Sequence, residues 1–496
     1  MEQDLASQTK FLYLNARSPT RTPASTSYPI LSKTSKFTMG GNSVEGEGSS
    51  TVLQIRGEVA EDGDGLALKM TNRINRVKLL KPAVDDNHCI FRLPERFKNI
   101  QEKSYKAPQM VSIGPYHWSN NDQDQIKWQC LECLLKRSGG DLNRFIESIR
   151  PLEIKAKECY SETINLNTDD FLEIMVLDGC FILEWLRFAY LGERGEKVEE
   201  DHAFARMGRV ILLKIYRDLL LLENQIPLFV LEKLFEASEM TSELKGTDSS
   251  LFSMVVEVFS EILLGIPFSQ DNYSRFNERL HLLDMVRSIF ISPGNELLTC
   301  DRDIVRTGYQ YKPFDTIPCV SKLRLAGIKV SPSKKKNVLE VAFQQKHGVI
   351  EMPTIILNDL MCSFLVNCVA FEQCHKISSN HFSIYILFLD CLVNTAGDIE
   401  YLCDHKVIEN YIETDNEAAQ FINNLGKGLI FDCDYFDFYI LCSEVNDYYR
   451  KRVNRLLTSF KREYFHKPWL WIGALVLFVL TFLQTFYTIY AYVHPK

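Results

Sequence analysis

An uncharged segment of 24 residues, Trp469–Tyr492, constrains this chain more than any other part of its sequence. As a helix it would be about 36 Å long, enough to cross a hydrocarbon core of roughly 30 Å. Its one strongly polar side chain is Gln484. Aromatic residues near both ends fit the two interfaces of a bilayer. They are Trp469, Trp471, Tyr487, Tyr490 and Tyr492. The segment predicts a transmembrane helix, with a buried core helix as the alternative.

Basic residues precede this segment and predict its orientation. They are Arg450, Lys451, Arg452, Arg455, Lys461, Arg462 and Lys467. Because a basic excess favours the cytoplasmic side, we expect a tail-anchored, single-pass protein with a cytosolic body and an exterior or lumenal tail at 493–496. The basic cluster either attracts anionic lipid or forms a solvated helix face that sets the topology. No secretory signal peptide is visible. A cytosolic body would leave the one sequon, Asn272-Tyr273-Ser274, unmodified.

The composition is that of a globular protein with an acidic balance. The chain has 496 residues, of which 46% are hydrophobic, and its formal net charge is −8. An acidic body disfavours nucleic acid as a partner, because phosphate binding needs a dense basic surface. Among 14 scattered cysteines, Cys130 and Cys133 form the one C-x-x-C pair, without the second pair that structural zinc requires. We interpret them as two buried thiols, with a redox pair as the alternative.

Periodicity predicts a mainly α fold with a small β element near 327–357. Residues 1–70 are expected to form a disordered extension, with a transit peptide as the alternative for 5–44, and a helical domain is expected over 89–465. The ranges predicted to be helical are 126–135, 169–190, 203–223, 227–237, 276–290, 359–373, 381–395, 417–425 and 436–464. Residues 292–318 are expected to form a long loop, and two or three short strands with a basic turn at Lys334–Lys336 are expected after Ala326.

No complete catalytic or metal-binding motif is present, so neither a cofactor nor a metal is expected. Asp178 and Glu223 lie in apolar surroundings, where a carboxylate must be paired or hydrogen-bonded. One hypothesis makes them an acid/base pair in a cleft, with His117 as a further base or ligand. The favoured alternative is structural: the two carboxylates hold helix ends and pair with Arg or Lys, and His117 belongs to a hydrogen-bonded turn.

Several segments together resemble the plant family called domain of unknown function 247. The motif residues that carry the resemblance include Ser112, Gly114, Pro115 and His117 of VSIGPYH, Asp178 of DGCFILE, and Glu223, Asn224, Gln225 and Pro227 of LENQIP. Further matches are Asn367, Glu372-Gln373, LVNTAGD at 392–398, Tyr464-Phe465, Pro468-Trp469 and LTFLQT at 480–485. The likeness covers about residues 89–490. One departure is Gln125, which replaces an acid ahead of Lys127 and leaves an ion pair there in doubt.

The resemblance implies a plant protein with a helical body, a C-terminal anchor, and no established activity or cofactor. Some members of the family are linked to pollen-side recognition in grass self-incompatibility, which suggests a binding role. We therefore expect a non-enzymatic interaction, recognition or signalling component at a membrane. The alternative is an enzyme of unrecognised class that uses Asp178, Glu223 and His117. A homo-oligomer is also conceivable, because Gln484 in hydrocarbon would either bind a second helix or be satisfied locally.

Overall fold

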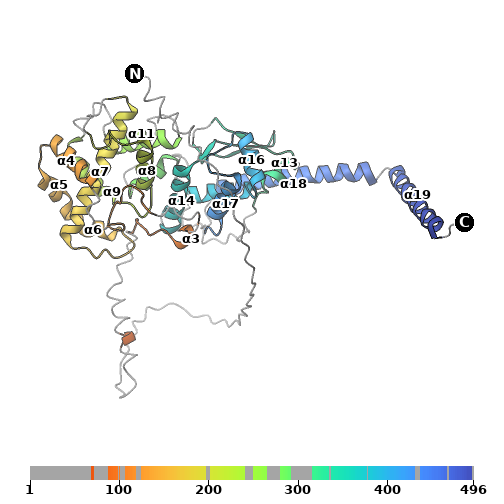
Figure 1. Ribbon diagram of the computed structural model, residues 1–496, viewed down its shortest axis with the longest axis horizontal. Coiled ribbons are helices and arrows are strands. Elements are labelled where there is room, and N and C mark those ends of the chain that lie inside the picture. The colour runs from red at the N-terminus through yellow and green to blue at the C-terminus, as the bar shows by residue number, and fades with distance from the viewer. Residues whose placement is uncertain are drawn as a thin grey trace, which may run out of the picture. The chain divides into compact units, whose positions relative to one another are not determined.

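The computed structural model describes most of the chain that follows the N-terminal extension (Figure 1). The described residues are 69–71, 88–98, 100, 107–118, 125–196, 202–240, 250–264, 280–291, 316–334, 337–376, 378–430, 436–465 and 468–493. Residues 87–496 belong to one structural unit and 11–86 to another. The predictions for residues 1–68, for the sequon at Asn272 and for most of the loop 292–318 lie outside the described residues.

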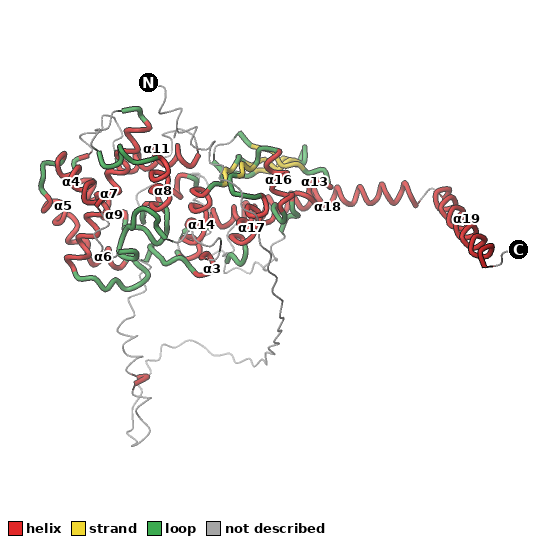
Figure 2. Tube along the Cα trace, viewed as in Figure 1, coloured by secondary structure: helices red, strands yellow, loops and turns green. Residues whose placement is uncertain are grey.

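The described chain is mostly helical, as predicted (Figure 2). The N-terminal half contains α3 (Glu95–Lys98), α4 (Gln125–Arg137), α5 (Leu142–Ile149), the 3-10 turn η1 (Arg150–Leu152), α6 (Glu153–Glu158), α7 (Thr168–Glu193), α8 (Arg209–Leu219), α9 (Leu228–Ala237), α11 (Leu251–Leu264) and α12 (Leu282–Ile289). The C-terminal half contains α13 (Val320–Leu325), α14 (Asp359–Cys374), α15 (His381–Leu392), α16 (Ala396–Asp404), α17 (Asp415–Gly426), α18 (Phe436–Phe465) and α19 (Pro468–Val493).

Helix α7 is the central helix of the N-terminal half. Asn167 caps its first turn by accepting a hydrogen bond from the Asp170 N–H at 2.8 Å. Most of its circumference is apolar and buried, which is typical of a core helix. Helices α4, α9 and α11 pack around it. Gly179 lets α9 approach closely, since a Cβ there would collide with the Leu234 side chain.

Helix α14 has the same central role in the C-terminal half. It is buried along most of its length and packs against α8, α12 and α15. Because α8 lies in the N-terminal half, this contact makes the core continuous. One apolar cluster therefore runs through both halves.

Two small sheets confirm the predicted β element and extend it. In the first, β3 (Val349–Met352) pairs in parallel with β1 (Lys329–Pro332) and antiparallel with β2 (Ala342–Gln344). In the second, β4 (Ile355–Leu357) pairs in parallel with β5 (Ile408–Asn410). Strand β5 has only three residues between α16 and α17, and its sequence gives no alternation long enough to predict a strand.

The helix predicted over Ala203–Glu223 is wrong at both ends. The structure begins α8 after Gly208 and ends it at Leu219. The apolar run continues to Leu222, but its last residues form a loop, because tertiary hydrogen bonds replace the helical ones there. The helix predicted to begin at Phe276 is described only from Leu282, after an N-cap formed by His281.

Helices α18 and α19 complete the described chain. The first part of α18 packs on the body, with Cys442 and Val445 fully buried. Along α19 large apolar side chains are exposed, including Leu477 and Phe478. Among the described residues, no single helix is both long enough and apolar enough to cross a membrane, and the apolar stretch within α19 is Leu475–Tyr490.

Candidate functional site

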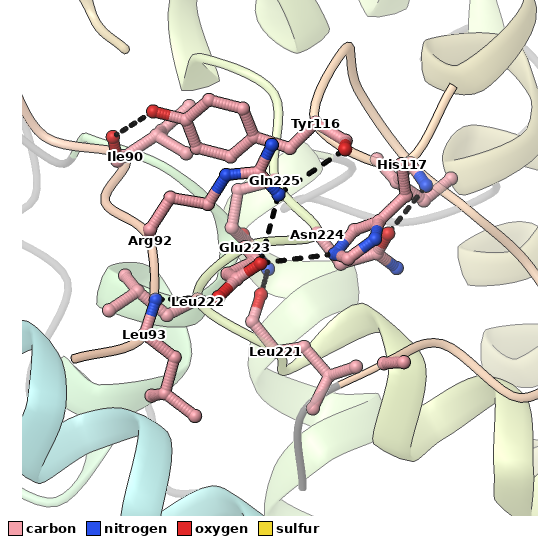
Figure 3. Close-up of polar contacts among 12 residues, drawn as sticks. Ile90, Arg92, Leu93, Tyr116, His117, Leu221, Leu222, Glu223, Asn224 and Gln225 are labelled. Carbon is pink, nitrogen blue, oxygen red and sulfur yellow. Dashed lines mark hydrogen bonds and ion pairs between the residues drawn. The ribbon is translucent and has the colours of Figure 1, made fainter. Parts of the chain in front are cut away.

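The loop between α8 and α9, Leu220–Pro227, is buried although loops usually lie on the surface. A buried loop must find partners for its polar backbone and side-chain groups inside the protein. The polar residues of the loop, Glu223, Asn224 and Gln225, each bind a different segment. Figure 3 shows Glu223 beside Arg92 and His117.

Glu223 binds the segment at the start of the described body. Its Oε1 accepts a hydrogen bond from the Leu93 N–H at 2.6 Å, and its Oε2 lies 3.1 Å from an Arg92 guanidinium nitrogen. The His117 Nε2 lies 3.5 Å from the same Oε2 (Figure 3). The carboxylate therefore has a backbone donor, a permanent cation and an imidazole around it.

Asn224 binds the backbone on both sides of Ser112. Its Oδ1 accepts from the Ile113 N–H at 2.6 Å, and its Nδ2 donates to the Val111 carbonyl at 3.1 Å. The same Nδ2 also donates to the Asp218 carbonyl at 2.9 Å. The Asn224 amide thus forms hydrogen bonds with backbone groups of this segment that a neighbouring strand would bind in a sheet.

Gln225 closes the end of α8 and reaches α12. Its Nε2 donates to the Leu219 and Leu221 carbonyls at 2.8 and 2.9 Å. Its Oε1 accepts from the Leu283 N–H at 3.0 Å. The Asn367 Oδ1 on α14 accepts from the Leu222 N–H at 2.8 Å. Three of these bonds satisfy backbone groups at and just after the end of α8, and the fourth satisfies an N–H group in the first turn of α12.

Two aspartates hold the segment 109–114 from the other side. The Asp218 Oδ2 accepts from three successive backbone N–H groups, those of Gln109, Met110 and Val111, at 2.8, 2.6 and 3.1 Å. The Asp178 Oδ2 accepts from the Gly114 N–H at 2.7 Å, and its Oδ1 lies 2.6 Å from the Lys127 Nζ.

Gly114 is required at the point where this segment meets the loop. Its φ is +72°, a conformation that L side chains rarely adopt. A Cβ at Gly114 would lie 2.5 Å from the Gln225 carbonyl oxygen. Both constraints come from the close approach of two backbones, so the glycine and the loop form one structural unit.

The hydrogen bonds around the loop Leu220–Pro227 form a network, and Arg92 and Tyr116 lie at its partly exposed edge. The Arg92 guanidinium lies 4.1 Å from the centre of the Tyr116 ring and also pairs with Glu162 at 3.1 Å. Burial lowers the pKa of His117, while nearby Glu223 raises it and Arg92 lowers it further. A neutral imidazole beside a carboxylate is chemically able to exchange protons, but Arg92 already compensates the charge of Glu223.

The structure places the predicted site residues in two groups. His117 and Glu223 contact each other, whereas Asp178 is occupied by Lys127 and the Gly114 N–H. The doubt about an ion pair at Lys127 is removed, because its partner is on α7 rather than ahead of it in α4. Pro227 precedes α9 and forms a backbone bridge with His281. Within the described ranges, no group of His, Cys, Asp or Glu is arranged to hold a metal ion.

Three residues with long-range polar contacts carry no signal in the sequence. Arg92, Tyr160 and Arg287 look like ordinary surface or aromatic positions, yet each binds a group more than 60 positions away. Arg287 is buried and lies 2.9 Å from Glu372 and 3.2 Å from Asp284. Burial raises the pKa of Glu372, and Arg287 opposes that shift.

Cys130 and Cys133 occupy different environments on α4. Cys130 is fully buried, and burial raises its pKa far above the ordinary value. Cys133 is half-buried, and its pKa is also raised, first of all by burial. Because the thiolate is the reactive form, these directions favour the structural interpretation of the pair over the redox one.

Comparison with known proteins gives the relationship of this chain to others. Residues 90–483 match the profile of DUF247, described as a plant protein of unknown function. The chain belongs to this family. The UPF0481 protein At3g47200 of Arabidopsis thaliana is 32% identical over 444 residues, which cover 85% of this chain and 90% of the relative. A second relative, the UPF0481 protein At3g02645 of Arabidopsis thaliana, is 24% identical over 492 residues, which cover 81% of this chain and 90% of the relative. No solved structure matches the chain.

The residues that match the family include the segments that contact one another around the buried loop. The loop Leu220–Pro227, the segment 109–117 and the Asp178 region all lie within the matched residues. These are the segments that the resemblance emphasised from sequence alone, and the structure brings them into mutual contact.

Proposed function

We propose that this DUF247 protein is a membrane-anchored interaction component, with α19 as its anchor and the helical body as its binding part. The observation that carries the proposal is the exposure of apolar side chains along α19. Five of these are Leu475, Leu477, Phe478, Phe482 and Tyr487, each at least 63% exposed. A helix of this composition is more favourable in lipid than in water.

Further features of α19 support the same proposal. The helix has 26 residues, which corresponds to about 39 Å. The hydroxyls of Thr481, Thr485 and Thr488 each donate to the carbonyl four residues earlier, so these polar groups are satisfied within the helix. Internal satisfaction of polar groups is what a hydrocarbon environment demands.

An interaction role is supported by how the polar motif residues are used. Asp178, Asp218, Asn224 and Gln225 hold backbone segments together, and a group used in this way is not free to bind a substrate. The enzyme alternative rests on His117 and Glu223 alone, and Arg92 and Leu93 already occupy that carboxylate. These intramolecular contacts favour an interaction or recognition role over catalysis by the same residues.

Fractionation of plant cells tests the anchor. The full-length protein with an N-terminal fluorescent tag should sediment with membranes and resist alkaline carbonate, whereas a variant that lacks residues 469–496 should become soluble. Protease added to sealed vesicles should digest the body. Full-length protein that carbonate releases would contradict the anchor, and a body protected from protease would contradict a cytosolic orientation.

Proximity labelling tests the interaction role. The biotin ligase is fused to the N-terminus of the full-length chain, and the matched control carries the ligase on residues 468–496 alone. We expect a reproducible set of proteins labelled by the full chain and not by the control. Identical labelling by both would argue for a protein whose body has no discrete partner.

A further inference from the structure

Helix α18 changes its character near residue 450. Before that point it packs on the body: Cys442 and Val445 are buried, and the Tyr448 ring packs edge-on against Phe343 at 5.7 Å. Arg450 and Lys451 are then exposed, and the helix continues to Phe465. About 16 residues, or roughly 24 Å of helix, thus follow the part of α18 that packs on the body.

The sequence of this continuation is amphipathic at the helical period. Apolar residues recur at spacings of three and four, so they share one face. They are Val453, Leu456, Leu457, Phe460 and Tyr464. The opposite side carries Lys451, Arg455 and Arg462, and Arg450, Arg452 and Lys461 flank it. Glu463 is the one acidic residue between positions 450 and 467.

The position of this segment shows which surface would cover it. Only residues 466 and 467 separate α18 from α19, and Pro468 starts the second helix, so the two helices need not be collinear. A basic, amphipathic helix beside a membrane-spanning one suits the plane of the interface, with its apolar side in the acyl boundary and its cations near lipid phosphates.

We propose that residues 450–465 of α18 lie along the membrane surface and bind anionic phospholipid headgroups. This inference rests on the proposed anchoring by α19. The positive charges at 450–467 complement an anionic leaflet, although the chain as a whole is acidic. The segment would then fix the height and tilt of the body above the bilayer.

Hydrogen–deuterium exchange of the full-length protein in lipid nanodiscs tests the inference. One lipid composition is phosphatidylcholine alone, and the other contains roughly three-tenths phosphatidylserine. We expect amides 450–465 to exchange more slowly with phosphatidylserine by at least about fivefold, since even one basic residue near an anionic surface contributes about a fivefold change in affinity. Equal exchange in both lipids would overturn the proposal.

A pair of matched variants separates local binding from net charge. The triple variant Arg450→Gln, Arg452→Gln and Lys461→Gln removes the cations that flank the apolar face and should abolish the lipid dependence. The control Lys322→Gln, Lys329→Gln and Lys334→Gln removes three exposed charges from the body and should preserve it. Loss of the dependence in the control alone, or in both variants, would overturn a site on α18.

Separate measurements test the apolar face of α18 and the anchoring by α19. Phe460→Gln should accelerate exchange at 450–465 in both lipids, and an unchanged rate would overturn the proposed orientation of the helix. Carbonate resistance of the protein in vesicles of the same lipids reports on α19. Its loss would overturn the anchor together with this inference, whereas retained resistance without phosphatidylserine dependence would overturn this inference alone.

Discussion

Gly114 combines two constraints that can be separated experimentally. Gly139 also has a positive φ, +88°, but a Cβ there would meet nothing within 4 Å. Gly139→Ala should therefore lower the free energy of unfolding only through backbone strain, by about 1 kcal/mol. Gly114→Ala adds the contact with the Gln225 carbonyl and should cost roughly 3 kcal/mol or more.

Denaturant unfolding of the two alanine variants measures this difference. It compares the free energy of unfolding of each variant with that of the wild type. Equal losses at the two positions would show that the loop moves to accommodate the methyl group, which contradicts a rigid contact at Gly114.

The Lys127–Asp178 pair provides a second test at the scale of residues. Both side chains are 3% exposed. Lys127→Met keeps the length of the side chain but leaves Asp178 with a buried, uncompensated charge, which should cost about 3–5 kcal/mol. Lys136, on the same helix, pairs with the exposed Glu132 at 2.7 Å, so Lys136→Met should cost at most about 0.5 kcal/mol.

Thermal unfolding of both methionine variants measures the contrast. If Lys127→Met unfolded at the wild-type temperature, Asp178 would not depend on its ion pair, and the account of this site would fail.

At the scale of elements, the contact between α7 and α11 predicts a pH dependence. Burial, together with the nearby carboxylates of Glu261 and Glu257 on α11, raises the pKa of Glu193 from 4.5 to about 7. Because the charged form is disfavoured in the folded state, this carboxyl costs stability as the pH rises from 4.5 to about 7. Arg194 offsets part of the local charge by pairing with Glu257 at 3.0 Å.

Glu193→Gln should remove this dependence. The variant should unfold at a higher temperature than the wild type at pH 8, and the difference should shrink towards pH 4.5. Glu132→Gln, at an exposed position of α4, is the matched control and should show no such trend. A constant difference at all pH values would contradict the titration of Glu193.

The sequence predicted elements better than it predicted their contacts. Helix α7 was expected over Asp169–Tyr190 because this stretch is apolar over most of its circumference, and the structure extends it by a few residues. The end of α8 was missed because side chains of the following loop, not the helix itself, satisfy the backbone there. Asp178 and Glu223 were recognised as buried acids, but their partners come from distant segments that periodicity does not pair.

At the scale of the whole molecule, orientation predicts the fate of the sequon at Asn272. A cytosolic body does not meet the glycosylation machinery, so the full-length protein from plant cells should keep its electrophoretic mobility after endoglycosidase treatment. Asn272→Gln should likewise leave mobility unchanged. A mobility shift abolished by Asn272→Gln would place the body on the lumenal or exterior side.

The segment at 89–93 has partners that lie far along the chain. The Cys89 carbonyl lies 3.1 Å from the His281 Nε2, 192 positions away, and the Leu93 N–H binds Glu223. At ordinary rates of translation, roughly 10–40 s pass between the synthesis of Cys89 and of His281. During that interval the segment can gain its contacts with Cys159, Ser161 and Glu223, but its contact with His281 is still missing. Production of this protein should therefore depend on chaperones that shield the nascent chain, and fragments ending before residue 281 should aggregate.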